Sequence, residues 1–196
     1  MGEIEASFLD KNVTLLHGVT SSGKTEIYIH LIDKCLQQGN QVLYLLPEIA
    51  LTTQITERLQ CFFGDKMGVY HSKFTDAQRL EIYQRQASDQ PYQLILGVRS
   101  SIFLPFQNLG LVIVDEEHEQ SYKQQEPAPR YHARNAAIML AQMFTSCKVL
   151  LGTATPSAES YHNCQTGKYG LVELKQRYQG IELPEIQVVD IDDLQH

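Results

Sequence analysis

One eight-residue segment combines glycines, a lysine and hydroxyl residues in a spacing that suits phosphate binding. It fits the pattern G-x-x-x-x-G-K-[ST] and consists of Gly18, Val19, Thr20, Ser21, Ser22, Gly23, Lys24 and Thr25. Glycines let the backbone curl so that its N–H groups point at phosphate oxygens, and the start of a following helix adds positive charge. Lys24 would supply a point charge to the β- and γ-phosphates, and the Thr25 hydroxyl would ligate Mg²⁺. The segment predicts a nucleoside triphosphate site.

A second group of candidate residues is acidic. An apolar run, Leu111 to Val114, leads directly into Asp115, Glu116, Glu117 and His118. Ligands of open α/β sheets bind at the carboxyl ends of the strands, which is where these carboxylates would lie. Asp115 would hold Mg²⁺, and Glu116 would orient and deprotonate an attacking water. By itself such a stretch could also be a solvated loop; paired with the phosphate loop, it makes Lys24, Asp115 and Glu116 the predicted catalytic residues.

Other nucleotide enzymes fit the sequence less well. The guanine-reading pattern Asn-Lys-x-Asp of GTPases does not occur in the sequence. A small-molecule kinase usually needs an arginine-rich lid, and arginine is sparse here. The second carboxylate and His118 indicate instead that water is the nucleophile, so we expect hydrolysis of the nucleotide.

The pattern of apolar residues predicts the elements that must position these groups. Six short runs, bounded by polar residues or glycine, are typical of strands buried on both faces of a parallel sheet. They are Val13 to Leu16, Val42 to Leu46, Val69 to Tyr70, Leu94 to Leu96, Leu111 to Val114 and Val149 to Leu151. The alternation of such strands with helices predicts an α/β fold with a mostly parallel sheet and helices on both faces.

Helical periodicity appears between these runs. One stripe spans Tyr28 to Leu36, and Gly39 can end that helix. A weaker stripe of Leu80, Tyr83 and Ala87 follows Thr75 and Asp76, either of which could cap its helix. A third stripe comprises Ala133, Ala137, Leu140, Ala141 and Phe144.

Composition narrows the class of protein. The 196 residues include 16 basic and 23 acidic side chains, a net charge of −7, so binding to a polyanion requires a local basic strip. The four cysteines form no C-x-x-C pair, which predicts neither zinc nor a disulfide framework and suits a reducing cytosol. No apolar run approaches the roughly 20 residues of a membrane span, so we expect no membrane partner.

A basic and aromatic stretch follows the acidic group. Lys123, Arg130 and Arg134 against Glu126 give a local excess of two positive charges, and three rings lie among them: Tyr122, Tyr131 and His132. Cations for phosphates and rings for base stacking are what binding to single strands requires. The alternative is a solvated, proline-broken surface loop with incidental aromatic residues.

Several motifs together resemble those of superfamily 2 helicases. The phosphate loop, the acidic D-E-E-H stretch and Gly152-Thr153-Ala154-Thr155-Pro156-Ser157 resemble motifs I, II and III of that family. Leu46 to Thr52 resembles motif Ia, and Gly97 to Phe106 resembles the Ib region. The segment Ser121-Tyr122-Lys123-Gln124-Gln125-Glu126 with Arg130-Tyr131-His132-Ala133-Arg134 is similar to an aromatic-rich loop of the primosomal, replication-restart branch.

The resemblance implies a RecA-like P-loop NTPase lobe that uses ATP and Mg²⁺. In such a lobe His118, Thr153 and Thr155 would relay the nucleotide state to the DNA side. The resemblance further implies that a set of residues meets single-stranded or forked DNA, namely Arg99, Ser100, Tyr122, Lys123, Arg130, Tyr131, His132 and Arg134. It also implies a bacterial, cytoplasmic protein whose partners include single-strand binding protein and other primosome members.

The resemblance also divides the chain. Residues 1–180 would form the first RecA-like domain, truncated before the phosphate loop because the upstream stretch contains no glutamine to read adenine. Residues 181–196 would form a short strand and a connector toward a second lobe that the sequence does not contain. Such a fragment alone would hydrolyse ATP barely at all. The alternatives are a nucleotide-dependent DNA-docking module without motor activity and another superfamily 2 translocase.

Overall fold

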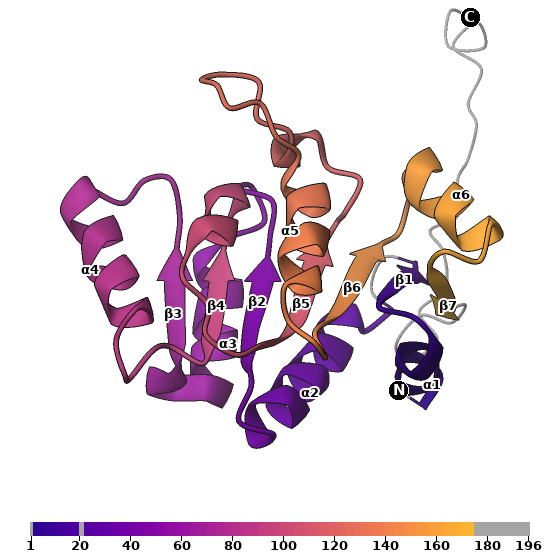
Figure 1. Ribbon diagram of the computed structural model, residues 1–196, viewed down its shortest axis with the longest axis horizontal. Helices are drawn as coiled ribbons and strands as arrows, with labels where there is room; N and C mark the ends of the chain where they lie inside the picture. The colour runs from indigo at the N-terminus through magenta and orange to yellow at the C-terminus, as the bar shows by residue number, and fades with distance from the viewer. Residues whose placement is uncertain (1, 20–21, 175–196) are drawn as a thin grey trace, which may run out of the picture.

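A single sheet organises the protein, whose computed structural model describes residues 2–19 and 22–174. Within those residues seven strands are ordered β3-β4-β2-β5-β6-β1-β7, and each pairing between neighbours is parallel (Figure 1). The predicted mostly parallel α/β sheet is therefore confirmed. The predicted strand and connector at 181–196 lie outside the described residues.

The elements alternate along the chain as the sequence predicts. The strands are β1 (Val13–Gly18), β2 (Gln41–Leu45), β3 (Met67–Tyr70), β4 (Leu94–Gly97), β5 (Leu109–Asp115), β6 (Lys148–Thr153) and β7 (Gly170–Leu174). The helices are α1 (Gly2–Asp10), α2 (Lys24–Gln37), α3 (Thr53–Phe63), α4 (Asp76–Gln86), α5 (Ala133–Gln142) and α6 (Ala158–Gln165). Three short 3₁₀ helices are η1 (Gly64–Lys66), η2 (Arg99–Phe103) and η3 (Gln120–Tyr122).

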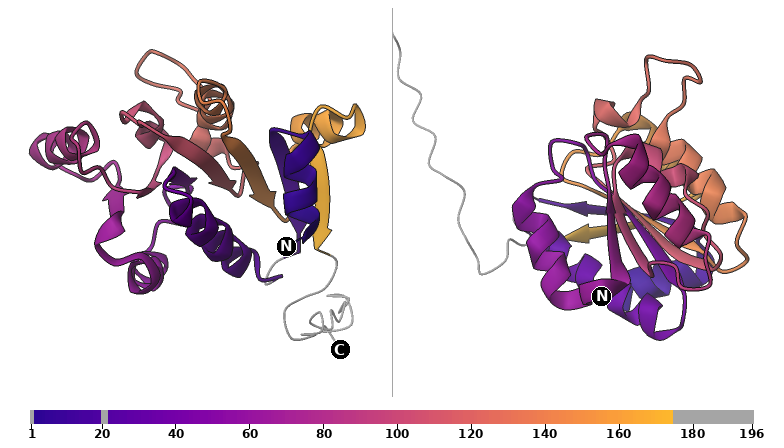
Figure 2. Two further views of the ribbon diagram at one scale, coloured as in Figure 1. Left: turned by 60° about the horizontal axis from the view of Figure 1, so that its bottom comes forward. Right: turned by 90° about the vertical axis from the view of Figure 1, so that its left-hand side faces the viewer.

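Successive strand residues are buried against opposite layers of helices, which explains the unbroken apolar runs. On one face Tyr44 and Ile113 pack with residues of α1, α2 and α3. On the other face Leu45 and Val112 pack with residues of α4, η2 and α5. Figure 2 shows the sheet between these two layers. Strands covered on both sides need apolar side chains at every position, as buried parallel strands do.

The six predicted strands are all present, but sequence reasoning missed three α-helices and one strand of the described residues. They are α1, α3, α6 and β7. In β7 only Val172 is buried among Gly170–Leu174, because this strand lies at the edge of the sheet beside β1. A short edge strand carries no continuous apolar run. None of the helices in the described ranges is both long and apolar enough to cross a membrane.

The stripe predicted for the helix after Thr75 is wrong. Thr75 does cap α4, with a reciprocal capping box to Gln78. However, Leu80 is 55% exposed and Tyr83 48% exposed, whereas Ile82 and Gln86 are buried. Helix α4 lies at the β3 end of the sheet. It buries only Ile82 and Gln86, which are four residues apart and so lie on one face of the helix.

The parallel arrangement brings three distant motifs to one edge. Strands β1, β5 and β6 are neighbours, and their carboxyl ends are Gly18, Asp115 and Thr153. The register pairs Asp115 with Gly152 and His17 with Thr153. The predicted motifs I, II and III therefore begin side by side at the carboxyl edge of the sheet.

Candidate nucleotide site and the loop beside it

The phosphate loop leaves β1 at Gly18 and enters α2 through Gly23. Gly23 has φ 82°, a left-handed conformation that favours glycine, and α2 starts at the next residue, Lys24. The Lys24 ammonium donates a hydrogen bond to the Gly18 carbonyl at 2.9 Å, across the mouth of the loop. Thr20 and Ser21 lie outside the described residues. The strand–loop–helix context that the motif requires is present.

The acidic turn, residues 115–118, begins where β5 ends. Two tyrosine hydroxyls donate to the Asp115 carboxylate: Tyr28 to Oδ1 at 3.0 Å and Tyr44 to Oδ2 at 3.3 Å. Burial raises the pKa of both tyrosines well above the ordinary value, so their hydroxyls keep the protons they donate. A Cβ at Gly152 would meet the Tyr28 oxygen at 1.7 Å, so only glycine leaves room for this contact.

The two halves of the site face one another. Tyr28 lies one turn along α2 from Lys24, so its bond to Asp115 joins the phosphate-loop helix to the end of β5. Burial raises the pKa of Asp115, the charge of Glu116 raises it further, and the nearby Lys24 ammonium opposes them. The carboxylate is thus held in a place where a cation would stabilise it.

These residues fit a magnesium-bound triphosphate. The Ser22 hydroxyl is buried in the phosphate loop with no partner among the described residues, so it can accept or donate to a ligand. The Thr25 hydroxyl and the Asp115 carboxylate are oxygen donors of the kind Mg²⁺ prefers. Lys24, in turn, can exchange the Gly18 carbonyl for phosphate oxygens. The donor set matches the predicted cofactors.

His118 joins the acidic turn to β6. Its Nδ1 lies 2.7 Å from the Thr153 hydroxyl and its Nε2 lies 3.3 Å from the Thr155 hydroxyl. The same Nδ1 is 3.6 Å from a carboxylate oxygen of Glu116. The structure therefore brings together the three residues that the sequence assigned to coupling, and it adds Glu116 to them.

Glu117 makes a second, buried link. Its side chain is fully buried and accepts hydrogen bonds from the Ser157 amide at 2.7 Å and the Ser160 hydroxyl at 2.8 Å. Arg134 completes the set with a 2.7 Å ion pair and also contacts Glu159. Burial pushes the pKa of Glu117 upward, but the Ser157 amide and the Arg134 guanidinium hold it below its ordinary value. Sequence reasoning gave Glu117 no role, because its partners lie 17 to 43 residues away.

Two residues predicted to contact DNA are instead buried. Arg134 is 4% exposed, and its guanidinium bonds to Glu117, Ser157 and Glu159. Tyr122 is 1% exposed, and its hydroxyl donates to two main-chain carbonyls. Neither side chain presents its polar group to a DNA strand. The prediction that these two residues contact DNA directly is therefore corrected.

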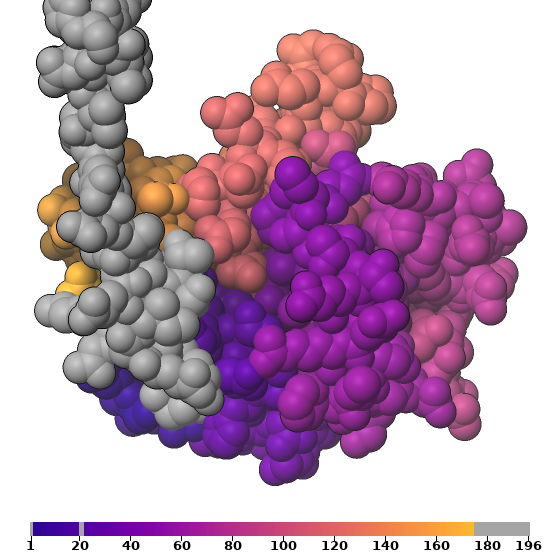
Figure 3. Space-filling model, turned by 180° about the vertical axis from the view of Figure 1, so that it is seen from behind, coloured from indigo at the N-terminus to yellow at the C-terminus, as the bar shows by residue number. Residues whose placement is uncertain are grey.

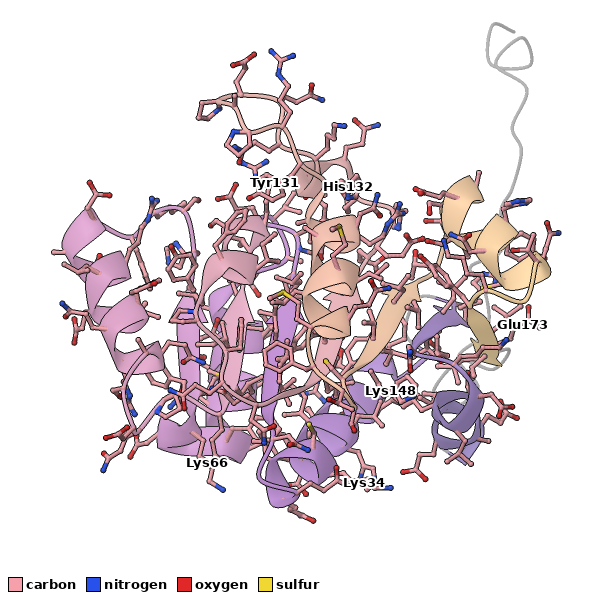
Figure 4. The ribbon with its side chains drawn as sticks, viewed as in Figure 1. Lys34, Lys66, Tyr131, His132, Lys148 and Glu173 are labelled. Carbon is pink, nitrogen blue, oxygen red and sulfur yellow. The ribbon has the colours of Figure 1, made fainter. Side chains whose placement is uncertain are left out.

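The remaining loop residues project from the molecule. Residues 123–132, here called the projecting loop, rise above the carboxyl edge of the sheet (Figures 1 and 3). Lys123 and Arg130 are exposed, and Arg130 pairs with Glu126 at the surface. Tyr131 and His132 are half-buried at its base (Figure 4). Burial and the Arg134 charge lower the pKa of His132, so it adds no positive charge at neutral pH.

A pocket of about 200 Å³ opens beside the base of the projecting loop. Arg99 lines it and donates to the carbonyls of Ser121 at 3.2 Å and Lys123 at 3.3 Å. The lining combines segments that the sequence related to motifs Ia and Ib, and includes Pro47, Glu48, Arg79, Arg99, Ser100 and Gln124. Arg99 and Ser100, both predicted DNA contacts, thus lie together.

Sequence reasoning missed two residues near this pocket. Arg79 lines it from α4, and its Nε is buried without a partner in the described residues. Phe103 is 61% exposed, and its ring packs edge-on against Tyr131 at 5.1 Å and 76°. Phe103 belongs to the segment compared with the Ib region, so an aromatic residue within that segment was a usable signal. Arg79 had none, because only the fold brings α4 to this edge.

The sequence of this chain matches known helicases. The sequence profile of the DEAD/DEAH box helicase family matches residues 3–164. The chain is 46% identical over 182 residues to replication restart protein PriA of Bacillus subtilis, covering 93% of this chain and 22% of that protein. It is 51% identical over 166 residues to PriA of Haemophilus influenzae, covering 85% of this chain and 22% of the relative.

Solved structures show the same fold. RecG bound to a three-way DNA junction superposes with TM-score 0.61 at 22% identity, over 88% of this chain and 22% of RecG. The Hef helicase domain of Pyrococcus furiosus gives TM-score 0.59 at 18% identity, over 88% of this chain and 38% of the solved domain. The chain spans about a quarter of the length of the curated relatives it matches.

Proposed function

This chain belongs to the DEAD/DEAH box helicase family, and we propose that it is the ATP-binding motor lobe of a DNA helicase that restarts replication at stalled forks. The proposal rests above all on the Tyr28–Asp115 hydrogen bond, which holds the phosphate-loop helix against the acidic turn. A site with both parts can bind a nucleotide and hydrolyse it. The similarity to PriA proteins supports the proposal that this hydrolysis drives unwinding of DNA during replication restart.

The nucleotide chemistry follows from the described side chains. Lys24 and the loop amides would hold the phosphates, while Thr25 and Asp115 would hold Mg²⁺, which offsets charge on the phosphate oxygens. Glu116 would orient the attacking water and accept its proton. His118, 3.6 Å from Glu116, is placed to respond to that change and to pass it to Thr153.

The DNA surface would lie along the carboxyl edge beside this site. Exposed Lys123 and Arg130 would meet phosphates, and Arg99 and Ser100 would line the strand's path. Tyr131 and Phe103 offer a ring pair on which bases can stack, and Arg79 adds a cation from α4. His132 would contribute its ring without charge.

A second RecA-like lobe would complete the motor. An arginine from such a lobe is worth on the order of 10³ to 10⁵ in rate, so this lobe alone should bind Mg-nucleotide weakly and turn it over barely at all. Cycles of closure between the lobes would step the intact protein along single-stranded DNA. Its partners would include single-strand binding protein and other primosome members. It would act in the bacterial cytoplasm.

The experiment uses the intact protein that carries this lobe. Lys24→Ala should lower ATP hydrolysis on the order of 10²-fold or more and abolish unwinding of a forked duplex, because the phosphates lose their fixed cation. The matched control is Lys34→Ala, which removes an exposed lysine from the same helix. If the Lys24 variant still unwinds DNA normally, the lobe is a nucleotide-dependent docking module and the motor proposal fails.

A further inference from the structure

The Asp115 carboxylate is held by donors on both of its oxygens. Oδ1 accepts the Tyr28 hydroxyl at 3.0 Å and the Glu116 main-chain amide at 3.1 Å. Oδ2 accepts the Tyr44 hydroxyl at 3.3 Å. Both tyrosines are 0% exposed, so water does not compete for their hydroxyls. The fold itself therefore sets the orientation of the carboxylate.

The two tyrosines reach Asp115 from different elements. Tyr28 lies on α2 three residues after Thr25, the other predicted Mg²⁺ ligand, so its bond ties Asp115 to the helix that carries that hydroxyl. Tyr44 lies on β2, in register with Ile113 of β5. The two rings pack edge-on, with 5.5 Å between their centroids and 74° between their planes. Each ring limits the movement of the other, which keeps both hydroxyls directed at the carboxylate.

Gly152 makes room for the Tyr28 hydroxyl. It lies opposite Asp115 on the neighbouring strand β6. A Cβ at this position would lie 1.7 Å from the Tyr28 oxygen, 2.9 Å from its Cζ and 3.3 Å from Oδ1 of Asp115. Any larger residue would push the hydroxyl away from the carboxylate. The glycine is therefore part of the arrangement that holds Asp115.

These bonds restrict how the carboxylate can contact a metal ion. An ionised carboxylate offers about two acceptor lone pairs on each oxygen. Tyr28 and Glu116 use both lone pairs of Oδ1, whereas the Tyr44 bond uses one of the two on Oδ2. A metal ion, or a water bound to it, can therefore approach through Oδ2 but not through both oxygens together.

The number of oxygens that a carboxylate offers affects which ion it suits. Ca²⁺ takes about six to eight oxygen ligands in flexible geometry and accepts carboxylates through both oxygens. Mg²⁺ is smaller, requires near-octahedral geometry and usually keeps several waters beside one or two carboxylates. A fixed carboxylate that offers one oxygen therefore suits Mg²⁺ better than Ca²⁺.

We propose that Tyr28, Tyr44 and Gly152 are positioning residues that hold Asp115 so that the nucleotide site selects Mg²⁺ over Ca²⁺. Tyr28 has the larger part, because its hydroxyl occupies the oxygen through which a second metal bond could form. This inference rests on the proposed function, since it needs a triphosphate at the phosphate loop to share the ion. None of the three residues has to touch the ion itself.

The first test is Tyr28→Phe in the intact protein, which removes one oxygen and leaves the ring in place. Binding of a fluorescent ATP analogue is measured in EDTA, in Mg²⁺ and in Ca²⁺. We expect the affinity gained from Mg²⁺ to fall roughly tenfold, a typical loss when a partner of a metal ligand is removed. The gain from Ca²⁺ should fall less, since Oδ1 becomes available, and the affinity in EDTA should stay close to the wild-type value. The control is Tyr83→Phe, which removes a hydroxyl from a half-exposed tyrosine on α4.

The second test is Tyr44→Phe, which removes the other hydroxyl from the same carboxylate. Oδ1 keeps both of its donors in this variant. The gains from Mg²⁺ and Ca²⁺ should therefore fall together, so that the preference for Mg²⁺ is kept. The loss should be smaller than in Tyr28→Phe, because the Tyr44 bond is the longer of the two.

The third test is Gly152→Ala, which displaces the Tyr28 hydroxyl without removing it. We expect the pattern of Tyr28→Phe. In Tyr28→Phe/Gly152→Ala the new Cβ no longer meets an oxygen, so the double variant should lose little more than Tyr28→Phe alone. Thermal unfolding shows which variants are folded, and Gly152→Ala decides the matter if Tyr28→Phe is not.

The outcomes separate the inference from the proposed function. If the folded Tyr28→Phe variant keeps the wild-type gain from Mg²⁺, or loses the gains from Mg²⁺ and Ca²⁺ equally, the inference is wrong and the function stands. An equal loss of affinity in EDTA and in Mg²⁺ would also overturn it, because the tyrosine would then act on the nucleotide. Loss of the Mg²⁺ preference in Tyr44→Phe would show that Oδ1 does not set the choice of ion. If the wild-type protein binds no nucleotide, the proposed function fails and the inference fails with it.

Discussion

Asp115 and Glu117 lie two residues apart in one turn, yet their surroundings move their pKa values in opposite directions. Burial and the neighbouring Glu116 raise the pKa of Asp115, although two tyrosine hydroxyls donate to it. Burial also disfavours the charge of Glu117, but a peptide amide, a guanidinium and a serine hydroxyl outweigh it and lower the pKa. Among the described residues Asp115 has only the opposing charge of Lys24 nearby, whereas Glu117 forms an ion pair with the buried Arg134.

From this difference we infer that Asp115 is a functional carboxylate and that Glu117 is a structural one. A group whose charged form is poorly stabilised by the protein gains most from an incoming cation, as expected of a magnesium ligand. A group already paired with a buried arginine is expected to fix the shape of its surroundings. We therefore infer different roles for these two acidic residues of one motif, and four predictions test that division.

The largest effect is expected for Asp115→Asn on catalysis. Loss of the charged ligand should lower the ATP hydrolysis rate of the intact protein on the order of 10²-fold or more, because metal stabilisation of the transition state is worth several kcal/mol. Steady-state kinetics at saturating Mg²⁺ measure it. Glu119→Gln, two residues beyond Glu117, is the control; an Asp115→Asn variant with normal turnover would remove Asp115 from the metal site.

The next effect concerns stability. Arg134→Met leaves Glu117 buried and unpaired, so we expect a loss of about 3–5 kcal/mol in the free energy of unfolding. Chemical unfolding at neutral pH measures the loss. The control is Arg58→Gln, which breaks a surface pair with Glu26 and should change stability by less than about 1 kcal/mol. Equal losses in the two variants would show that the buried pair is no more important than an exposed one.

The pH dependence of stability gives a third test. Since the folded pKa of Glu117 lies below the ordinary value of 4.5, its contribution is fully present above that value and is lost as the pH falls toward the folded pKa. Unfolding midpoints measured from pH 7 down to pH 3 should therefore decline less steeply in Glu117→Gln/Arg134→Gln than in the wild type. Parallel declines would mean that the charge of Glu117 does not stabilise the folded protein.

The smallest expected effect is a gain in stability, whereas the preceding tests expect losses. Because the folded pKa of Asp115 is raised, its ionisation at neutral pH opposes folding, and Asp115→Asn removes that penalty. Without Mg²⁺ or nucleotide, we expect the variant to melt at a higher temperature than the wild type in a thermal unfolding scan. The gain should shrink as the pH falls, since wild-type Asp115 then becomes protonated. A lower melting temperature would contradict the division.

Sequence reasoning succeeded where a motif is local. The phosphate loop, the end of β5 and the residues after β6 each lie within one short stretch, and the alternation of strands and helices brings them together. It failed where a contact joins distant stretches. The bonds of Asp115 to Tyr28 and Tyr44 join residues 87 and 71 positions apart, and no spacing in the sequence indicates them.

The loop residues show the same limit. Counting Arg134 among the cations of a surface loop assumed that a charged side chain beside aromatic residues is exposed. The fold instead buries it beside Glu117, because α5 packs against β5 next to the acidic turn. Exposed Lys123 and Arg130 behave as the count assumed. Net charge over a segment cannot distinguish these cases, since it contains no information on which side chains are paired.

The wholly parallel pairing of the described strands also offers a practical opportunity. The phosphate loop, the acidic turn and the projecting loop lie at the carboxyl ends of the strands, whereas Lys34, Lys66 and Lys148 lie toward the opposite edge (Figure 4). A fluorophore or spin label attached at Lys66 would be separated from a bound nucleotide and from bound DNA by the full height of the sheet. Such a reporter could follow the approach of another domain in real time without disturbing the event it records.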